Sequence, residues 1–378
     1  MGNAMTSSPP PGPPDMSHAA RLARHCAVST ALELLGDRRL GELVAGAPRL
    51  GSGVGGTTAL LEVEGTPVFV KRIPLTDLER RPENVRSTAN LFGVPPFCQY
   101  GLGPGAGFGV WRELAAHAMT TGWVLGGRHA GFPLLHHWRV LPEPPRAPTA
   151  GQRAEIEAAV AYWEGSPAVR ERMEASARAS ASVVLFLEYL PQNLYDWLNA
   201  QVALGDDAVA AACAMMEREL AAGVSFMNAG GLLHFDTHFC NILTDGRRLY
   251  FTDFGLAASP RFELSATERD FLRLNADHDA AYAERALVNR LVIVLGRPSG
   301  REELLDLVRE CARGAVLPGV PAEAAAVIRR YAPVAAAVNA FYGTLIDERR
   351  TVPYPADEIR RIRAATGSAA APAPVPAV

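Results

Sequence analysis

The residues best suited to chemistry lie in two short segments of the second half of the chain. The first reads His234-Phe-Asp236-Thr-His238-Phe-Cys-Asn241, and the second reads Thr252-Asp253-Phe254-Gly255. Phosphoryl transfer needs a carboxylate that orients the attacking hydroxyl and accepts its proton, and oxygen ligands that hold magnesium against nucleotide phosphates. Asp236, Asn241 and Asp253 provide these groups. The two segments therefore predict a phosphotransfer centre.

A short hairpin is predicted between the two segments. Ile242-Leu243 and Leu249 to Thr252 are apolar and are separated by an Asp245-Gly246 turn. Such a hairpin would bring Asn241 and Asp253 together at one end. Local folding could thus assemble the expected metal ligands.

A glycine-rich segment precedes this centre in the first quarter of the chain. It consists of Gly51, Ser52, Gly53, Val54, Gly55 and Gly56, which satisfy G-x-G-x-x-G. A Rossmann fingerprint must open a helix, but Thr57 to Val63 alternates like a strand. A Walker A loop would need lysine directly after its last glycine, but Lys71 comes fifteen positions after Gly56, so this motif is excluded. The strand context favours a loop that covers a nucleotide, and a flexible glycine turn without a ligand is the alternative.

The chain contains a single lysine. All but one of its 37 lysines and arginines are arginine, and the exception, Lys71, ends the apolar run Val68-Phe-Val-Lys71. An ammonium is more compact than a guanidinium, so this position suggests a phosphate contact, although a solvated charge at a strand end is the alternative. Such a lysine needs an acidic partner. Glu113 is the best candidate and Glu83 the second.

These residues resemble the H-x-D-x-x-x-x-N catalytic loop and the D-F-G metal motif of the protein-kinase-like superfamily, from Leu50 to the late 200s. The resemblance implies an α+β, bilobal fold with a small β-rich N-lobe and a larger helical C-lobe. It implies that ATP and Mg²⁺ are cofactors, that Asp236 is the catalytic base, and that Asn241 and Asp253 hold the metal. Backbone groups of Glu188 and Leu190 would face adenine, and His234 would be structural.

Two departures place the chain between branches of that superfamily. His238 stands two places after Asp236, as in the aminoglycoside and choline phosphotransferases, where protein kinases usually have lysine. No A-P-E-like anchor follows Gly255. A small-molecule hydroxyl is therefore the expected acceptor. A Ser/Thr kinase acting on a protein or peptide is the alternative, and a pseudokinase regulatory module is a weaker one.

The location of the acceptor and a competing metal site are further hypotheses. A small cationic acceptor predicts converging acidic residues, with Asp270, Asp277, His278 and Asp279 as candidates. His234-x-Asp236-x-His238 could instead bind a transition metal, because imidazole and carboxylate are suitable ligands.

Composition limits the remaining possibilities. The 378 residues have a net charge of -3, five cysteines without a C-x-x-C pair, and apolar runs shorter than a bilayer requires. No nucleic-acid or membrane partner is expected, and the cytoplasm is the expected location. Predicted regions are a disordered leader (1–17), an N-lobe (18–190) with inserts at 91–110 and 142–180, a C-lobe (191–363) and a disordered tail (364–378). Within the N-lobe the sequence also predicts a hairpin that turns at Glu64-Gly65, a helix over 76–89 and a long helical stretch over 152–179.

Overall fold

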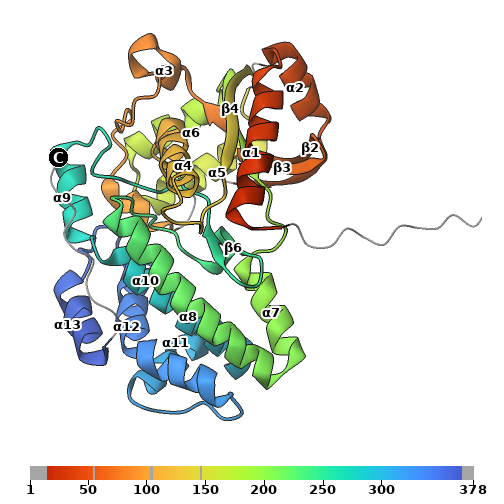
Figure 1. The fold of residues 1–378 in the computed structure, drawn as a ribbon. Coiled ribbons are helices and arrows are strands. Elements are labelled where there is room, and N and C mark those ends of the chain that lie inside the picture. Colours follow the sequence, from red (N-terminus) through yellow and green to blue (C-terminus); the bar gives the residue numbers. More distant parts are fainter. Residues whose placement is uncertain (1–14, 54–55, 103–104, 145–146, 368–378) are drawn as a thin grey trace, which may run out of the picture.

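The structure is a computed structural model that describes residues 15–53, 56–102, 105–144 and 147–367. The predicted leader up to residue 14 and the tail from residue 368 lie outside these residues, as do Val54 and Gly55. Within them the protein is mixed α+β, with a five-stranded antiparallel sheet in one part and a large helical part below it in Figure 1.

The sheet has the strand order β1-β2-β3-β5-β4. Its strands are β1 (Arg49–Gly53), β2 (Gly56–Val63), β3 (Thr66–Leu75), β4 (Leu135–Pro142) and β5 (Ala181–Glu188). The predicted hairpin around Glu64-Gly65 is confirmed as β2–β3. Strand β5 pairs with both β3 and β4, so it lies in the interior of the sheet.

Both faces of the sheet are covered, which explains the continuous apolar run of β5. Val184 and Phe186 point to helices α1 (His18–Glu33) and α2 (Asp37–Gly46), which lie together on one face (Figure 1). Val183 and Leu185 point to α4 (Val110–Leu125) on the other face. Side chains alternate along a strand, so a run buried on both faces must be apolar throughout.

The insert regions form helices and a structured connection. Helices α5 (Ala150–Tyr162) and α6 (Pro167–Ala177) replace the single long helix expected over 152–179. The helix predicted over 76–89 is also wrong: only α3 (Asp77–Arg80) and the short helix η1 (Pro82–Asn84) form there. Helix η2 (Pro96–Tyr100) interrupts the irregular segment between Leu91 and α4.

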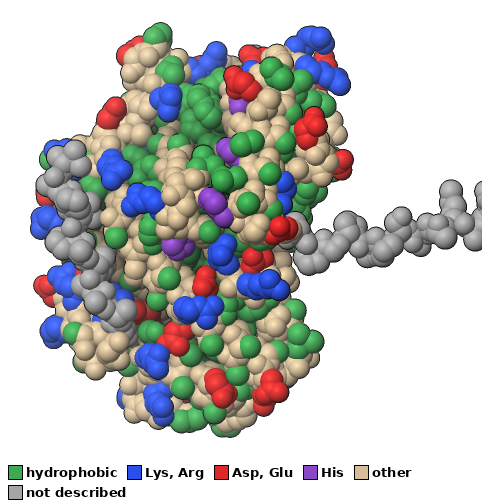
Figure 2. Space-filling view, in the orientation of Figure 1, with side chains coloured by type: hydrophobic (Ala, Val, Ile, Leu, Met, Phe, Trp, Pro, Cys, Tyr) green, Lys and Arg blue, Asp and Glu red, His purple; other side chains and the backbone are tan. Residues whose placement is uncertain are grey.

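The helices of the helical part are α7 (Leu194–Leu204), α8 (Asp206–Ala229), α9 (Ala266–Leu274), α10 (His278–Leu291), α11 (Arg301–Ala312), α12 (Ala322–Asp347) and α13 (Ala356–Thr366), with the short helices η3 (Phe239–Asn241) and η4 (Val292–Gly296). The predicted tail thus starts inside α13. The long helix α8 runs across the front in Figure 1 and packs with one face against α7, α10 and α12. No helix of the described residues is long and apolar enough to cross a membrane. Acidic and basic side chains are interspersed on the face seen in Figure 2.

Candidate active site

Lys71 lies on β3 with its ammonium between two carboxylates. Its Nζ is 2.6 Å from Oε1 of Glu113 and 2.9 Å from Oδ1 of Asp253, and the residue is only 7 % exposed. Burial disfavours the charged form, but Glu113 and then Asp253 outweigh it and hold the pKa of Lys71 above its usual range. Lys71 is therefore a buried, permanently charged group, not a solvated strand end. Glu83, the alternative partner, lies exposed in η1.

Helix α4 carries Glu113 and is fixed at its first turn. Glu79 accepts hydrogen bonds from the Val110 amide at 3.0 Å and, through its carbonyl, from Nε1 of Trp111 at 3.0 Å. Arg112 donates to Oε1 of Glu268 on α9 at 2.7 Å. Glu113 thus reaches Lys71 from a helix that is tied to both parts of the molecule. The pattern Thr76-x-x-Glu79 is a capping box, which could have drawn attention to Glu79.

Asp236 is positioned by Asn241, for which the sequence predicted only a role as metal ligand. Nδ2 of Asn241 donates to Oδ2 of Asp236 at 2.9 Å and to its carbonyl at 3.1 Å. The predicted hairpin is confirmed as β6 (Ile242–Thr244) and β7 (Leu249–Phe251), and the Thr252 amide donates to the carbonyl of Asn241. Asn241 and Asp253 therefore lie at the same end of this hairpin.

Asp279 holds the backbone that precedes Asp236, so its predicted role in an acceptor pocket is wrong. Its carboxylate accepts from the amides of His234 at 2.6 Å and Phe235 at 2.8 Å, and the residue is fully buried. Phe235 has a left-handed φ of 64°, a conformation that costs energy and needs such support. Asp279 thus positions the backbone that leads into Asp236.

The other three candidates for an acidic acceptor pocket do not converge either. His278 is buried against the hydroxyl of Tyr342, Asp277 pairs with Arg360, and Asp270 is exposed. None of them lines a cavity next to Asp236. His278 and Asp279 were expected at the acceptor site because they follow Asp253 closely in sequence. The first turn of α10 instead buries both side chains inside the helical part.

Two ring contacts connect α4 to the segment that begins at His234. The ring of His117 lies 4.9 Å from that of Phe254, which lies 5.1 Å from that of His234. Burial lowers the pKa of His117 to about 3, so its ring is neutral. The sequence analysis predicted a structural His234 but assigned no role to His117. These two contacts hold the ring of Phe254, which follows Asp253 in the chain.

A cavity of about 300 Å³ lies beneath the sheet. Its lining includes Phe69, Lys71, Leu187, Glu188, Leu190, Asn241 and Asp253. It has apolar walls at the Leu187–Leu190 end and charged groups at the other. Such a gradient suits a flat aromatic ring that carries phosphates.

The described residues of the glycine-rich segment belong to strands: Gly51, Ser52 and Gly53 end β1, and Gly56 begins β2. Thr58, two residues after Gly56, lines the cavity, whereas Gly51 and Gly56 do not. A Cβ on Gly56 would lie 2.0 Å from the carbonyl oxygen of Arg72, and its φ is 121°. Glycine is therefore required there by the close approach of β3, whatever the loop binds.

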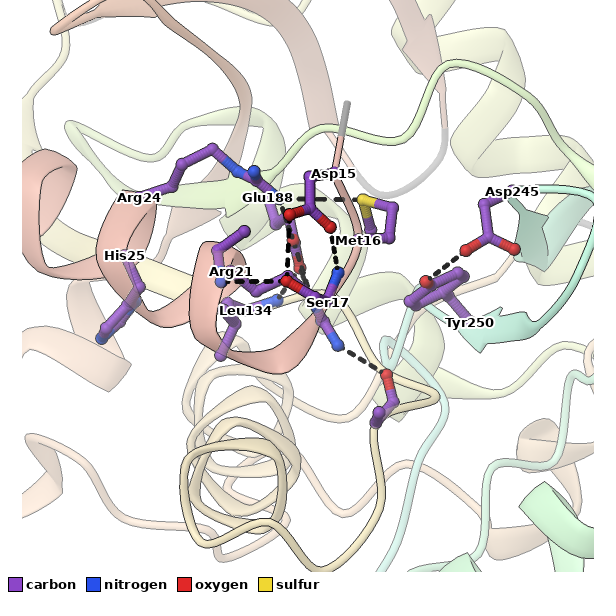
Figure 3. A network of polar contacts seen from close by, with 12 residues as sticks. Asp15, Met16, Ser17, Arg21, Arg24, His25, Leu134, Glu188, Asp245 and Tyr250 are labelled. Carbon is purple, nitrogen blue, oxygen red and sulfur yellow. Dashed lines mark hydrogen bonds and ion pairs between the residues drawn. The ribbon is translucent and has the colours of Figure 1, made fainter. Parts of the chain in front are cut away.

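The side chain of Glu188 is held by Arg21 of α1, a residue that the sequence analysis missed (Figure 3). Arg21 donates twice to this carboxylate, at 2.6 and 2.9 Å, and also to the carbonyls of Ala130 and Phe132. The Glu188 amide donates to the carbonyl of Leu134. Arg21 and the groups that accept its hydrogen bonds, called the Arg21 cluster below, thus fix the edge of the cavity where adenine was expected. No local pattern marks an ion pair between residues 167 positions apart.

Breaking the Arg21 cluster should cost stability. Arg21→Met leaves the Glu188 carboxylate buried without its partner, and loss of one member of a buried pair typically costs about 3–5 kcal/mol of unfolding free energy. Arg24→Met, which removes an arginine 4.0 Å from Glu188 and partly exposed, should cost less than about 1 kcal/mol. Urea unfolding measures both. Equal effects of the two variants would contradict the inference.

A second cavity, of about 280 Å³, meets the first at Asp253. Asp236 lines this second cavity, together with Gly101, Leu102, Phe108, Leu256 and Arg172. A Cβ on Gly101 would lie 3.0 Å from Oδ1 of Asp236, so the 91–110 insert touches the predicted base. The two inserts pack together through Cys98, Phe108, Trp163 and Val169. They therefore form a wall next to the site.

The competing transition-metal site is not formed. No group of three or more His, Cys, Asp or Glu side chains in the described part of the chain is arranged to hold a metal ion. The ring of His234 contacts the carbonyl of Thr252 through Nε2 and the amide of Asp236 through Nδ1. Asn241 and Asp253 are suited instead to a hard cation that shares its ligands with a bound phosphate.

Lys71, Glu113, Asp236, Asn241 and Asp253 are thus brought together from β3, α4 and the two segments around the β6–β7 hairpin. Their charges interact: burial alone would raise the pKa of Asp253, but Lys71 lowers it to about 2.

No protein-family model matches this chain, and no curated protein is significantly similar to it in sequence.

Proposed function

We propose that the protein is an ATP-dependent phosphotransferase that moves the γ-phosphate of ATP to a hydroxyl group of a small molecule. The observation that carries the proposal is the arrangement of Lys71, Asp253 and Asp236 where two cavities meet. One cavity has the shape and polarity for a nucleotide. The other adjoins Asp236 and has room for an acceptor.

We propose with it a bilobal protein-kinase-like fold. The five-stranded sheet with α4 would be the N-lobe, within residues 18–190, and the helices after residue 191 would be the C-lobe. The charged pair from β3 to α4 and the hairpin between Asn241 and Asp253 support this assignment. Adenine would lie along the segment from Glu188 to Leu190.

In the proposed reaction the chain acts by positioning and by charge. Lys71 binds phosphate oxygens, while Glu113 holds its ammonium in place. Asn241 and Asp253 would hold magnesium, which neutralises phosphate charge when bound. Asp236 orients the acceptor hydroxyl and takes its proton. A bond forms between the acceptor oxygen and the γ-phosphorus, the bond to the β-phosphate oxygen breaks, and ADP leaves.

The contact of Gly101 with Asp236 favours a small acceptor over a peptide. The 91–110 insert leaves a cavity of limited volume beside the base, where a protein substrate needs an open groove. A single experiment separates these acceptors: purified protein with labelled ATP and magnesium is given a metabolite extract or a peptide library. Labelled small molecules would support the proposal. Labelled peptides alone would overturn its acceptor class, and no magnesium-dependent transfer to either would overturn it altogether.

The activity should show an acidic limb set by Asp236. Burial raises the pKa of this carboxyl above its usual range, and His238 nearby opposes the shift only in part. The base works only when deprotonated, so kcat/KM should fall as the pH drops through a midpoint above the usual pKa of an aspartate. His238→Gln removes the opposing positive charge and should move the midpoint to higher pH. A profile without this limb, or one that the variant leaves in place, would contradict the assignment.

A further inference from the structure

The second cavity contains a buried cation that the proposed reaction does not use. Arg172 of α6 lines this cavity and is only 5 % exposed. Its Nη1 donates to Oε2 of Glu79 at 2.9 Å, and its guanidinium lies over the ring of Phe92. Its Nε has no hydrogen-bond partner among the residues that the structure describes. A buried donor without a partner costs free energy unless something else accepts its hydrogen bond.

The acidic side chains of this cavity already have other tasks. Glu113 and Asp253 hold Lys71, and Asp236 is the proposed base. The charge of Glu79 is likewise shared, because it accepts from the amides of Thr76 and Val110 as well as from Arg172. No acidic residue of the described lining is therefore left to bind a cationic acceptor. Arg172 is the lining residue that is suited to bind an anion.

The walls of the cavity leave room for a small molecule with an apolar middle. Ile73, Leu102, Phe108, Val110 and Leu256 are the apolar lining residues. The cavity extends from Asp236 to Arg172 and Ser176 on α6, so an acceptor that fills it reaches both. The insert wall is also held in place: Gln99 donates to the carbonyl of Leu256 at 3.0 Å, and Tyr100 donates to Oδ1 of Asn275 at 2.9 Å.

We propose that the acceptor is a small alcohol that carries an anionic group, a carboxylate or a phosphate, and that Arg172 binds this group while Asp236 orients the hydroxyl. This inference rests on the proposed function. A guanidinium fits both anions because its planar donors match their oxygens. The 142–180 insert thereby contributes a specificity residue to the site, and the 91–110 insert encloses the substrate between that residue and the base.

The test measures binding separately from turnover. Protein saturated with magnesium and a non-hydrolysable ATP analogue is titrated with four sets of alcohols of similar size. The sets carry a carboxylate (glycerate, gluconate, pantothenate), a phosphate (glycerol phosphate), an ammonium (choline, ethanolamine) or no charge (glycerol, inositol). Saturation-transfer NMR records which of them bind. We expect members of an anionic set to bind at least ten-fold more tightly than their neutral and ammonium counterparts.

Variants on α6 identify the residue responsible. Arg172→Gln should remove the preference for anions and leave binding of the nucleotide analogue unchanged. Arg170→Gln, an exposed neighbour that pairs with Glu157, should change neither. Ser176→Met, which fills the cavity but keeps the Arg172–Glu79 pair, should weaken binding of the anionic alcohols and decides the matter if Arg172→Gln does not fold.

Three results would overturn the inference: preferential binding of the ammonium set, no binding of any anionic alcohol, or anionic alcohols that bind as tightly to Arg172→Gln and to Ser176→Met as to the wild type. Failure of the proposed function looks different. In that case the wild-type protein would not bind the nucleotide analogue with magnesium at all, which calorimetry measures without any acceptor.

Discussion

Asp236→Asn should lower kcat for phosphoryl transfer by about 10²–10⁴-fold, the usual contribution of a general base. The amide has the shape of the carboxylate and can still accept the hydrogen bond from Nδ2 of Asn241, so the catalytic segment should keep its conformation. It cannot take the proton of the acceptor hydroxyl. Single-turnover transfer from labelled ATP measures the loss. Calorimetry should show that the magnesium complex of ATP binds as before.

A matched variant tests whether the effect belongs to this site. Asp270→Asn makes the same chemical change at an exposed carboxylate on α9 whose neighbour Arg273 is also exposed, and it should leave kcat unchanged within two-fold. Circular dichroism checks that both variants are folded. If Asp236→Asn kept more than a third of the wild-type transfer rate, Asp236 would be ruled out as the base.

The parts of the site that lie close together in sequence were predictable. The chain from Asp236 to Asp253 folds back through one short hairpin, so residue types and spacing were enough to bring Asn241 and Asp253 together. The β2–β3 hairpin is likewise local, and it fixes the strand that carries Lys71. Glu113 was identified because a lysine that binds phosphates needs an acidic partner. That reasoning used charge, and the structure confirms the pair.

The parts that depend on tertiary packing were not predictable. Asp279 stands in the polar run Asp277-His278-Asp279 at the start of α10. Only the packing of that helix determines that Asp279, and not a neighbour, contacts the backbone of His234. Arg21 and Arg172 are two of many arginines, and nothing in their local sequence indicates burial. The predicted helix over 76–89 failed for a related reason: Pro82 interrupts it, and Glu79 bonds to α4 instead of to solvent.

The fold gives different surroundings to the two ends of the cavity beneath the sheet. Arg21 and Glu188 make one end rigid, because a buried bidentate pair with further carbonyl contacts has few alternative arrangements (Figure 3). At the other end Lys71 is held only by groups that also belong to the proposed chemistry. A change at Arg21 should therefore affect stability first, whereas a change at Lys71 should affect the reaction.

Lys71→Arg should lower kcat/KM for ATP by about 10²-fold, the usual loss when a donor to developing charge is removed. The ammonium fits between Glu113 and Asp253, which lie 2.6 and 2.9 Å away. A guanidinium is larger and planar, so it must displace one of these carboxylates. Displacing Glu113 loosens α4, and displacing Asp253 moves a proposed metal ligand. The charge is unchanged, so a large loss would show that shape and not charge decides the function of this residue.

The neighbouring residue provides the control. Arg72 points to the opposite side of β3 and pairs with Glu143 at the surface. Arg72→Lys makes the opposite substitution, lysine for arginine, at the neighbouring position, and it should leave kcat/KM within about two-fold. Thermal unfolding should show that Lys71→Arg keeps the fold. If Lys71→Arg transferred phosphate at the wild-type rate, the phosphates would be held by another group, and the single lysine of this chain would serve only to pair Glu113 with Asp253.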